Sequence, residues 1–407
     1  MKRNQIGPKD KTCHFRFRWA ALLGLGWALT GCGGPSAPVT GSVGPATSAK
    51  GPEAPIVTVY IWDQYLSPGL MEDFKKRTGI EVVPKIYEST DEMVEGLKSD
   101  PGAYDVFLCE DGYIQILAGK RLMKELDHSK LKNFGNIAEP YQNPVFDPKN
   151  QYTVPYLRGT TLLAYRKDKL PNPRHSWTIL KDEQLNGKVS FLNAGMECYD
   201  VVLRMMGIDL QSATASQIET AADTMVGMVR DRGLRFGDDN EVKDYLLRGD
   251  AWVSMIYSGD AALIAEENPE VPIGYFIPDE GAILWTDSFC ISRDSERIEN
   301  AYKFLDFMLE AESAAKSANE LHYASPNRAA APLLSEELLS DEAIYPRPEV
   351  LARCSYFNIK DMDSKRMVNV GWRRVMEAWY ALSGQVNNAT KEPIGEIQNP
   401  SAVPVPN

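Results

Sequence analysis

Histidine, cysteine and recognisable catalytic motifs are scarce in this chain. It contains 4 His and 6 Cys in 407 residues, and no H-E-x-x-H, C-x-x-C or G-x-S-x-G motif occurs. No P-loop or dinucleotide-binding glycine motif follows a predicted strand. We therefore expect no enzymatic activity, no metal and no cofactor. A hydrolase that uses a pair of carboxylates stays an alternative, because any acidic chain offers candidate pairs.

Positive charge is also in short supply. The chain has 44 Lys and Arg residues against 56 Asp and Glu residues, which gives a formal net charge of −12. Such a surface repels phosphate backbones, so we expect no nucleic-acid partner. The apolar run near the N-terminus covers only residues 19–29, which is too short to span a bilayer permanently.

The N-terminal residues have the pattern of an export signal. Basic residues between positions 2 and 18 precede the apolar run, and small residues then lead to Cys32. This order predicts a lipoprotein signal peptide over 1–31. The sequence Leu29-Thr30-Gly31-Cys32 is similar to the lipobox of bacterial lipoproteins, in which the cysteine is lipidated and becomes the first residue. A plain signal peptide followed by a chance cysteine is the alternative.

Two further segments have compositions that do not favour a packed core. Residues 32–54 are rich in Gly, Pro, Ser, Ala and Thr and predict a flexible tether, and residues 385–407 predict a disordered tail. We therefore expect a protein of the periplasm or cell envelope that a lipid on Cys32 anchors to a membrane. The disulfide state stays open for the four remaining cysteines, Cys109, Cys198, Cys290 and Cys354.

The rest of the chain alternates strand patterns with helix patterns, which is typical of an α/β fold. Strands are predicted at 56–62, 80–87, 104–109, 161–166, 188–192, 252–257, 273–277 and 289–292. Helices are predicted at 68–79, from 89 onward, and near 197–206, 215–232, 241–248, 297–320 and 365–382. Two α/β lobes of comparable size account for the length best.

Acidic and aromatic side chains gather where the predicted strands end, which is where open α/β sheets bind ligands. These residues are Trp62, Asp63, Tyr65, Glu110, Asp111, Glu197, Tyr257, Asp260, Trp285 and Asp287. Carboxylates make charge-assisted hydrogen bonds to alkyl ammonium groups, and aromatic rings attract the same cations and cover their methylene groups. The pattern therefore predicts a site for a cationic amine.

Each of these residues has a simpler interpretation when it is taken alone. An aspartate just after a strand often caps a helix, as Asp63, Asp111 or Asp260 would. Glu197 alone would be a solvated residue in the first turn of a helix, and a lone tryptophan is usually part of the core. The recurrence of the pattern at several strand ends favours the binding site.

From residue 56 to about 380, the chain resembles the periplasmic spermidine/putrescine-binding proteins of ABC importers. The resemblance rests on the stretches VYIWDQYLSPGLMEDFKKRTGI, YESTDEM, GAYDVFL, FDPKNQYTVPYLRGTT, EGAILWTDSF and YASPNRAA, in the expected order and spacing. It implies a two-lobed type II periplasmic binding protein fold with a ligand cleft between the lobes. Lobe 1 would contain 55–160 and about 284–340, and lobe 2 would contain about 161–283 and 341–384.

The resemblance also implies roles for individual residues. Ligand contacts carry over to Trp62, Asp63, Tyr65, Glu197, Asp260, Trp285, Asp287 and Tyr323, with Tyr257 in the place of a tryptophan. The departures from the family pattern are Glu110-Asp111 in place of a small hydroxyl residue and its neighbour, Arg158 in place of a tryptophan, and Ala194 in place of an aspartate. Arg158 either forms an ion pair with Glu110 or Glu197, or binds a carboxylate of a zwitterionic ligand.

The function that the resemblance implies is that of a monomeric solute-binding component of an ABC importer. It would bind a polyamine and pass it to a membrane permease, which works with an ATPase. Two alternatives keep the fold: a lipoprotein that reports polyamine to a signalling partner, and a binder of a zwitterionic amine or amino acid.

Overall fold

The computed structural model describes residues 52–356 and 362–384. The predicted signal peptide, most of the predicted tether and the predicted tail lie outside the described residues. Within the described part, no helix is both long enough and apolar enough to cross a membrane. The four described cysteines are free thiols.

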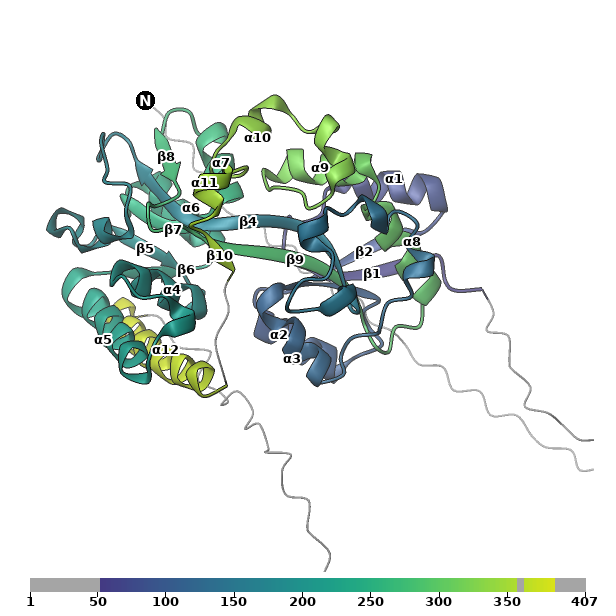
Figure 1. Ribbon diagram of the computed structural model, residues 1–407, viewed down its shortest axis with the longest axis horizontal. Coiled ribbons are helices and arrows are strands. Elements are labelled where there is room, and N and C mark those ends of the chain that lie inside the picture. The colour runs from purple at the N-terminus through teal and green to yellow at the C-terminus, as the bar shows by residue number, and fades with distance from the viewer. Residues whose placement is uncertain (1–51, 357–361, 385–407) are drawn as a thin grey trace, which may run out of the picture. The chain divides into compact units, whose positions relative to one another are not determined.

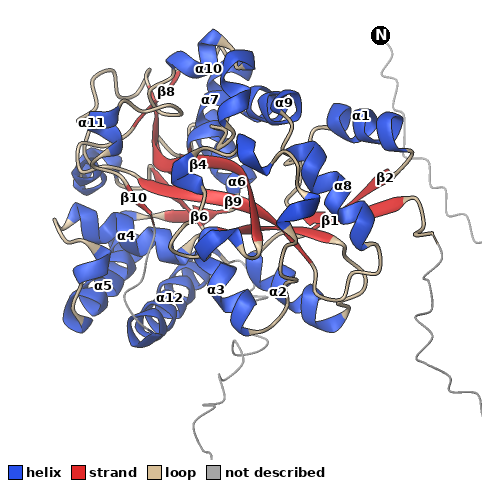
Figure 2. Cartoon of the chain, turned by 45° about the vertical axis from the view of Figure 1, so that its right-hand side comes forward, coloured by secondary structure: helices blue, strands red, loops and turns tan. Residues whose placement is uncertain are grey.

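Ten strands form one mixed sheet with helices packed against it (Figures 1 and 2). The strands are β1 (Ile56–Ile61), β2 (Glu81–Ile86), β3 (Val106–Glu110), β4 (Thr153–Arg166), β5 (Val189–Leu192), β6 (Arg235–Gly237), β7 (Val253–Tyr257), β8 (Ile273–Phe276), β9 (Ile283–Ile291) and β10 (Ser355–Tyr356). The helices are α1 (Pro68–Thr78), α2 (Thr90–Ser99), α3 (Asp111–Gly119), α4 (Gly195–Met205), α5 (Ala215–Arg232), α6 (Asp239–Arg248), α7 (Ser258–Glu267), α8 (Ile298–Met308), α9 (Ala311–Leu321), α10 (Glu336–Ser340), α11 (Pro348–Leu351) and α12 (Met362–Ser383).

The sheet has two parallel halves joined by an antiparallel centre. Its order is β2-β1-β3-β9-β4-β7-β5-β6, with β10 on β9 and β8 on β4. β1 runs parallel to β2 and β3, and β5 runs parallel to β6 and β7. β9 and β4 are antiparallel to each other, and they are also antiparallel to β3 and β7 respectively. These two long strands therefore connect the two halves.

Local sequence signals explain several of the element boundaries. The Ser67 hydroxyl accepts a hydrogen bond from the amide of Leu70, Pro68 occupies the first turn, and α1 ends at Gly79, whose φ is 74°. At α2, the Ser89 hydroxyl accepts from the amide of Glu92. The predicted strand and helix positions around these caps are confirmed.

Other predictions were incomplete. The helix predicted at 297–320 is two helices, α8 and α9, which are separated at Leu309 and Glu310. β4 and β9 each begin several residues before their predicted starts, and α3 and α7 were not predicted. Trp285 and Asp287 therefore lie inside β9 rather than ahead of it. The polar residues in the early parts of β4 and β9 hid these strands, because both belong to the buried centre of the sheet, where simple apolar alternation fails.

Two large clusters of buried apolar side chains support the two halves of the sheet. The first contains Trp177, Phe191 and Tyr199 and extends to the body of α12, whereas the second contains Phe74 and Phe289. A smaller third cluster lies around β3 and α2. The partly buried rings of Tyr257 and Tyr275 pack against both large clusters.

The first described residues are bonded to the folded part. The carboxylate of Glu53 accepts hydrogen bonds from the amides of Glu299 and Asn300 in the first turn of α8. The side-chain amide of Asn300 donates to the carbonyls of Ala54 and Ile56. A carboxylate at a helix N-terminus satisfies amides that have no partner within the helix. The folded part thus begins by Glu53, inside the segment predicted as tether.

Candidate functional site

Eight of the predicted site residues form one group, which we call the acidic–aromatic cluster. It comprises Trp62, Tyr65, Glu110, Glu197, Tyr257, Trp285, Asp287 and Tyr323. Most of them stand at the ends of β1, β3 and β7 or in the first turn of α4, while Trp285 and Asp287 belong to β9. The central antiparallel strand therefore contributes directly to a group that the sequence placed only at strand ends.

Pairing between β3 and β9 brings two carboxyl groups of the cluster together. Glu110 lies directly opposite Asp287 in the register of the two strands. The hydroxyl of Tyr65 donates to Oδ2 of Asp287 at 2.8 Å. The hydroxyl of Thr90 donates to Oε1 of Glu110 at 2.8 Å.

Glu197 is held on the same side by β4. The hydroxyl of Thr161 donates to its Oε2 at 2.5 Å. The solvated position that Glu197 would have as an ordinary first-turn residue is therefore not observed, since its carboxyl group is tied to the sheet.

Burial changes the protonation of these carboxyl groups. The pKa of Asp287 is raised to about 8, mainly by desolvation; the hydrogen bond from Tyr65 lowers the pKa and the charge of Glu110 raises it, and both effects are included in this value. The pKa of Glu197 is likewise raised to about 8, mainly by desolvation and, less strongly, by nearby carboxylates such as Glu110, against the opposing hydrogen bond from Thr161. Asp287 and Glu197 therefore hold protons at neutral pH when no cation is present.

The aromatic members form a continuous chain of edge-to-face contacts. Ring centroids are separated by 5.7 Å between Trp62 and Tyr65, and by 5.8 Å between Tyr65 and Tyr323. The chain continues from Tyr323 to Trp285 at 5.2 Å and from Trp285 to Tyr257 at 5.7 Å. Such contacts fix ring positions and leave π-faces for a cation.

Two glycines that the sequence analysis did not single out make room for these rings. A Cβ atom on Gly159 would lie 2.3 Å from the ring of Trp285, its partner across the β4–β9 pair. A Cβ atom on Gly259 would lie 2.5 Å from the ring of Tyr323. Only the pairing register would have identified Gly159, and a single sequence does not reveal that register.

Two predicted carboxylates have other surroundings. Asp63 is exposed, and its Oδ1 accepts a hydrogen bond from the amide of Gln64. Asp260 is partly buried on α7, forms an ion pair with Lys243 of α6 at 3.2 Å and shares a hydrogen bond with Tyr323, at the edge of the cluster. The N-cap residue of α7 is Tyr257, so Asp260 does not cap that helix. The sequence does not predict the ion pair of Lys243 with Asp260, because nothing in it indicates that α6 and α7 pack together.

Two of the predicted specificity positions lie beside the cluster. The carboxyl group of Asp111 accepts a hydrogen bond from the amide of Thr286 at 3.1 Å, and desolvation raises its pKa well above the usual range. Ala194 is the N-cap residue of α4 and offers no side-chain hydrogen bond to the helix.

Arg158 lies on the other face of the β4–β9 pair. It is opposite Thr286, whereas Gly159 is opposite Trp285, and neighbouring residues of a strand point to opposite faces. The guanidinium carbon lies 5.7 Å from the ring centroid of Tyr141 and 5.3 Å from that of Tyr345. The expected ion pair with Glu110 or Glu197 is not among the ion pairs between described residues, because the strand register turns the side chain away from both.

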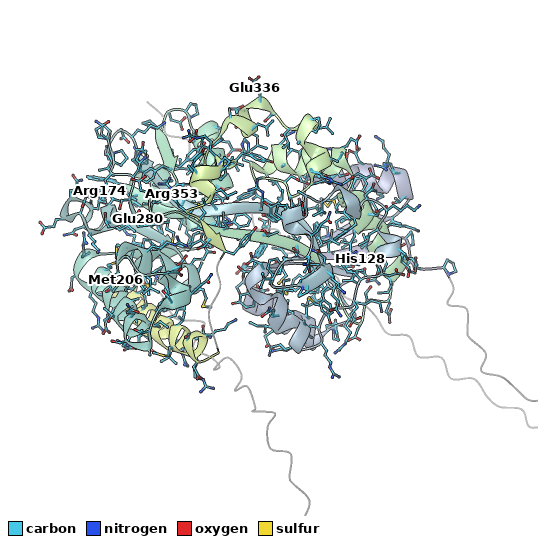
Figure 3. The ribbon with its side chains drawn as sticks, in the orientation of Figure 1. His128, Arg174, Met206, Glu280, Glu336 and Arg353 are labelled. Atoms are coloured by element: carbon cyan, nitrogen blue, oxygen red, sulfur yellow. The ribbon has the colours of Figure 1, made fainter. Side chains whose placement is uncertain are left out.

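The three described histidines take part in structural contacts. His128 is labelled among the side chains in Figure 3, and its Nε2 lies 2.9 Å from the carbonyl oxygen of Asn150. His175 stacks on Phe276, with ring centroids 4.2 Å apart, and Nε2 of His322 lies 3.4 Å from Glu266. In the described part of the chain, no group of three or more suitable side chains is arranged to hold a metal ion.

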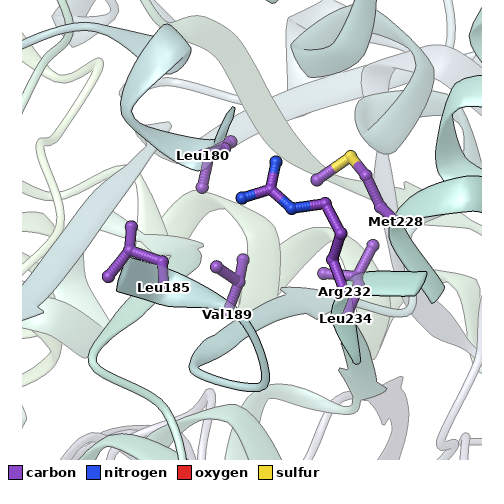
Figure 4. A pocket seen from close by; sticks show the side chains of 6 residues that line it. All are labelled: Leu180, Leu185, Val189, Met228, Arg232 and Leu234. Atoms are coloured by element: carbon purple, nitrogen blue, oxygen red, sulfur yellow. The ribbon is translucent and has the colours of Figure 1, made fainter. Parts of the chain in front are cut away.

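A small cavity lies away from the acidic–aromatic cluster. Its volume is about 10 Å³, and it is lined by Leu180, Leu185, Val189, Met228, Arg232 and Leu234 (Figure 4). A cavity of this size holds at most one water molecule. A wider hollow of about 390 Å³ beside α9 also contains no member of the cluster.

Stability should depend on pH through the carboxyl groups whose pKa is raised, among them Asp287 and Glu197. Below about pH 8, Asp287 and Glu197 bind protons in the folded protein, whereas in the unfolded chain they stay ionised down to about pH 4. The free energy of unfolding should therefore fall as pH rises from about 5 to 8, by up to about 1.4 kcal/mol per pH unit for each group.

Urea unfolding of the ligand-free protein at several pH values measures this slope. Asp287→Asn should remove the contribution of one group, while Asp63→Asn, a change at an exposed carboxylate, should leave the slope unchanged. Equal slopes for the wild type and Asp287→Asn would contradict the raised pKa of Asp287.

The close approach at Gly159 predicts a stability difference. Gly159→Ala should lower the free energy of unfolding by about 1–3 kcal/mol, because the new methyl group overlaps the Trp285 ring. Gly135→Ala is the matched control, since its Cβ would meet nothing within 4 Å. Thermal unfolding of both variants makes the comparison, and equal midpoints would show that Trp285 is not held against β4.

Comparison with known proteins identifies the family. Residues 69–346 match the model of the bacterial extracellular solute-binding proteins. The chain is 31% identical over 301 residues to the spermidine/putrescine-binding periplasmic protein of Escherichia coli, covering 74% of this chain and 85% of that protein. It is 28% identical over 343 residues to the putrescine/cadaverine-binding protein of Pseudomonas aeruginosa, covering 81% and 96%. The solved structure of the spermidine/putrescine ABC transporter substrate-binding protein PotD from Streptococcus pneumoniae superposes with a TM-score of 0.70 at 25% identity, covering 80% of this chain and 99% of that one. The two-lobed α/β fold is thus confirmed, and the chain belongs to the bacterial extracellular solute-binding protein family.

Proposed function

We propose that this protein binds a polyamine of the putrescine or spermidine type in the acidic–aromatic cluster and supplies it to an ABC importer. One observation carries the proposal. The ion pairs between described residues involve neither Asp287 nor Glu197, although both carboxyl groups are largely withdrawn from water. Buried carboxylates are normally paired, so this arrangement favours a cationic ligand as the partner.

The proposed ligand contacts follow from the chemistry of the cluster. Ammonium groups of the ligand would displace the protons of Asp287 and Glu197 and donate charge-assisted hydrogen bonds to the two carboxylates. The rings of Trp285 and Tyr323 would cover the methylene chain and add cation–π attraction. The ligand ammonium group that takes the place of each proton carries a positive charge. That charge stabilises the ionised carboxylate, which burial alone would destabilise.

Binding would be coupled to movement between the two halves of the sheet. We assign lobe 1 to residues 55–160 and about 284–340, and lobe 2 to about 161–283 and 341–384, as the sequence predicts. β4 and β9 then connect the lobes, and Glu110 and Glu197 approach the ligand from different lobes. A ligand that touches both lobes stabilises the closed form by the difference between its affinities for the two forms.

The cellular setting belongs to the same proposal. The protein would be exported, lipidated at Cys32 and tethered to a membrane by residues 32–54, and it would act as a monomer that docks on a permease. The relative from Escherichia coli is described as a periplasmic protein, which supports an extracytoplasmic site of action. The family consists of solute-binding proteins, and we propose that this chain makes and breaks no covalent bond.

Calorimetric titration tests the function. The panel contains putrescine, cadaverine, spermidine, spermine, agmatine, γ-aminobutyrate and basic amino acids, added to protein from which bound ligand was removed by unfolding and refolding. We expect tight one-to-one binding of a diamine or polyamine. At about pH 7, the heat should vary with the ionisation enthalpy of the buffer, because binding releases protons from Asp287 and Glu197. No binding of any cationic amine would refute the proposal.

Asp287→Asn tests the central carboxyl group. We expect the affinity for the best ligand to fall at least tenfold and the release of protons to decrease. Asp63→Asn is the control, because Asp63 is exposed and bonded to a backbone amide. Unchanged affinity of Asp287→Asn would remove this residue from the site.

A zwitterionic ligand is not favoured by the position of Arg158. The guanidinium stacks with Tyr141 and Tyr345 on the face opposite Trp285, so it is turned away from the cluster. We expect Arg158→Met to leave the ratio of affinities for putrescine and γ-aminobutyrate unchanged within about threefold. A selective loss of γ-aminobutyrate binding, measured by the same titration, would restore Arg158 as a ligand-binding residue.

A further inference from the structure

A lysine on α12 approaches the acidic–aromatic cluster from the far part of the chain. The body of α12 packs against α5 and α4, and its buried residues Val368 and Val375 belong to the first core cluster. The helix begins on the side that faces α2 and α3 (Figure 1). There, Nζ of Lys365 lies 5.6 Å from the centroid of the Tyr113 ring, in the first turn of α3.

The ammonium group of Lys365 is close enough to Glu110 to respond to its charge. Desolvation lowers the pKa of Lys365, and the carboxylate of Glu110 at the end of β3 opposes that shift. Glu110 is also the carboxylate whose charge raises the pKa of Asp111, Glu197 and Asp287. Lys365 therefore brings a positive charge of the protein near an acidic group that influences three others.

We infer that Lys365 is a specificity-determining residue. Its ammonium group lies over the ring of Tyr113, three residues after Glu110, and its charge repels a ligand ammonium group that approaches this end of the acidic–aromatic cluster. This inference rests on the proposed function and narrows it: the ligand is a diamine with two primary ammonium groups, and a triamine is disfavoured by repulsion from Lys365. Specificity then depends on a repulsive element as well as on attraction.

The experiment compares putrescine, a diamine, with spermidine, a triamine. Calorimetric titration of both amines gives the ratio of their dissociation constants for the wild type and for Lys365→Met, which keeps the length of the side chain without its charge. We expect the wild type to favour putrescine, and we expect Lys365→Met to shift the ratio at least tenfold toward spermidine. Lys365→Arg, which keeps the charge, should retain the preference of the wild type.

Arg366→Met is the matched control, because it removes one positive charge from the neighbouring, exposed position of α12. A similar shift in this control would show that the ratio of dissociation constants responds to the net charge of the protein, and it would overturn the inference. Lys365→Gln gives the same comparison if Lys365→Met does not fold.

The inference and the proposed function fail in different ways. A wild type that binds both amines, with a ratio that Lys365→Met and Lys365→Gln leave unchanged, would overturn the role of Lys365 and keep the polyamine function. A wild type that prefers spermidine would also overturn the role of Lys365 and keep the polyamine function. A wild type that binds no amine would overturn the proposed function and this inference with it.

Discussion

The antiparallel pairing of β4 with β9 is the contact on which the arrangement of this molecule depends. It joins two parallel half-sheets. Without this pairing, the polar residues at the strand ends of one half would lie apart from those of the other. Its register places Trp285 over Gly159 and turns Arg158 to the opposite face together with Thr286. A shift of one residue would exchange the two faces, so the composition of the cluster depends on this register. The same pair is also the part of the sheet that two moving lobes would share.

The cluster combines burial with negative charge, which is costly for a folded protein. Asp287 and Glu197 reduce that cost by holding protons when no cation is present. This state makes the site selective in a simple way. A neutral molecule of the same shape cannot replace a proton, whereas an ammonium group can replace it and bring its own hydrogen-bond donors. The rings of the cluster then contribute attraction to a cation and contact with methylene groups, without discriminating finely between chain lengths.

Local signals in the sequence were sufficient for most of the elements and for seven of the eight members of the cluster, whereas Tyr323 came from the family resemblance. The caps at Ser67 and Ser89 and the glycine at position 79 marked α1 and α2, because these signals act within a few residues. The coincidence of aromatic and acidic residues at strand ends identified Glu197 and Tyr257, because parallel strands bring such ends together. What remained hidden depends on contacts between distant segments. The pairing of Asp260 with Lys243, the room made by Gly159 and the orientation of Arg158 all require knowledge of packing or register, neither of which is local.

The position of Lys365 shows how an acidic site of this kind can distinguish its ligands. Amines that differ by one methylene group differ little in the contact area that they offer to aromatic rings. Contact with the rings alone therefore gives only a small difference in affinity between such amines. Amines that differ in the number of their charges are easier to distinguish, because electrostatic forces act on each charge over several ångströms. Glu110 makes the cluster more acidic, and Lys365 comes from a helix that packs on the other half of the molecule to offset that charge. Because the two residues come from different halves, a movement of one half relative to the other would change the distance between them. The interaction of Lys365 with Glu110, which we propose makes the site selective for the number of ligand charges, would therefore also contribute to the stability of the closed form.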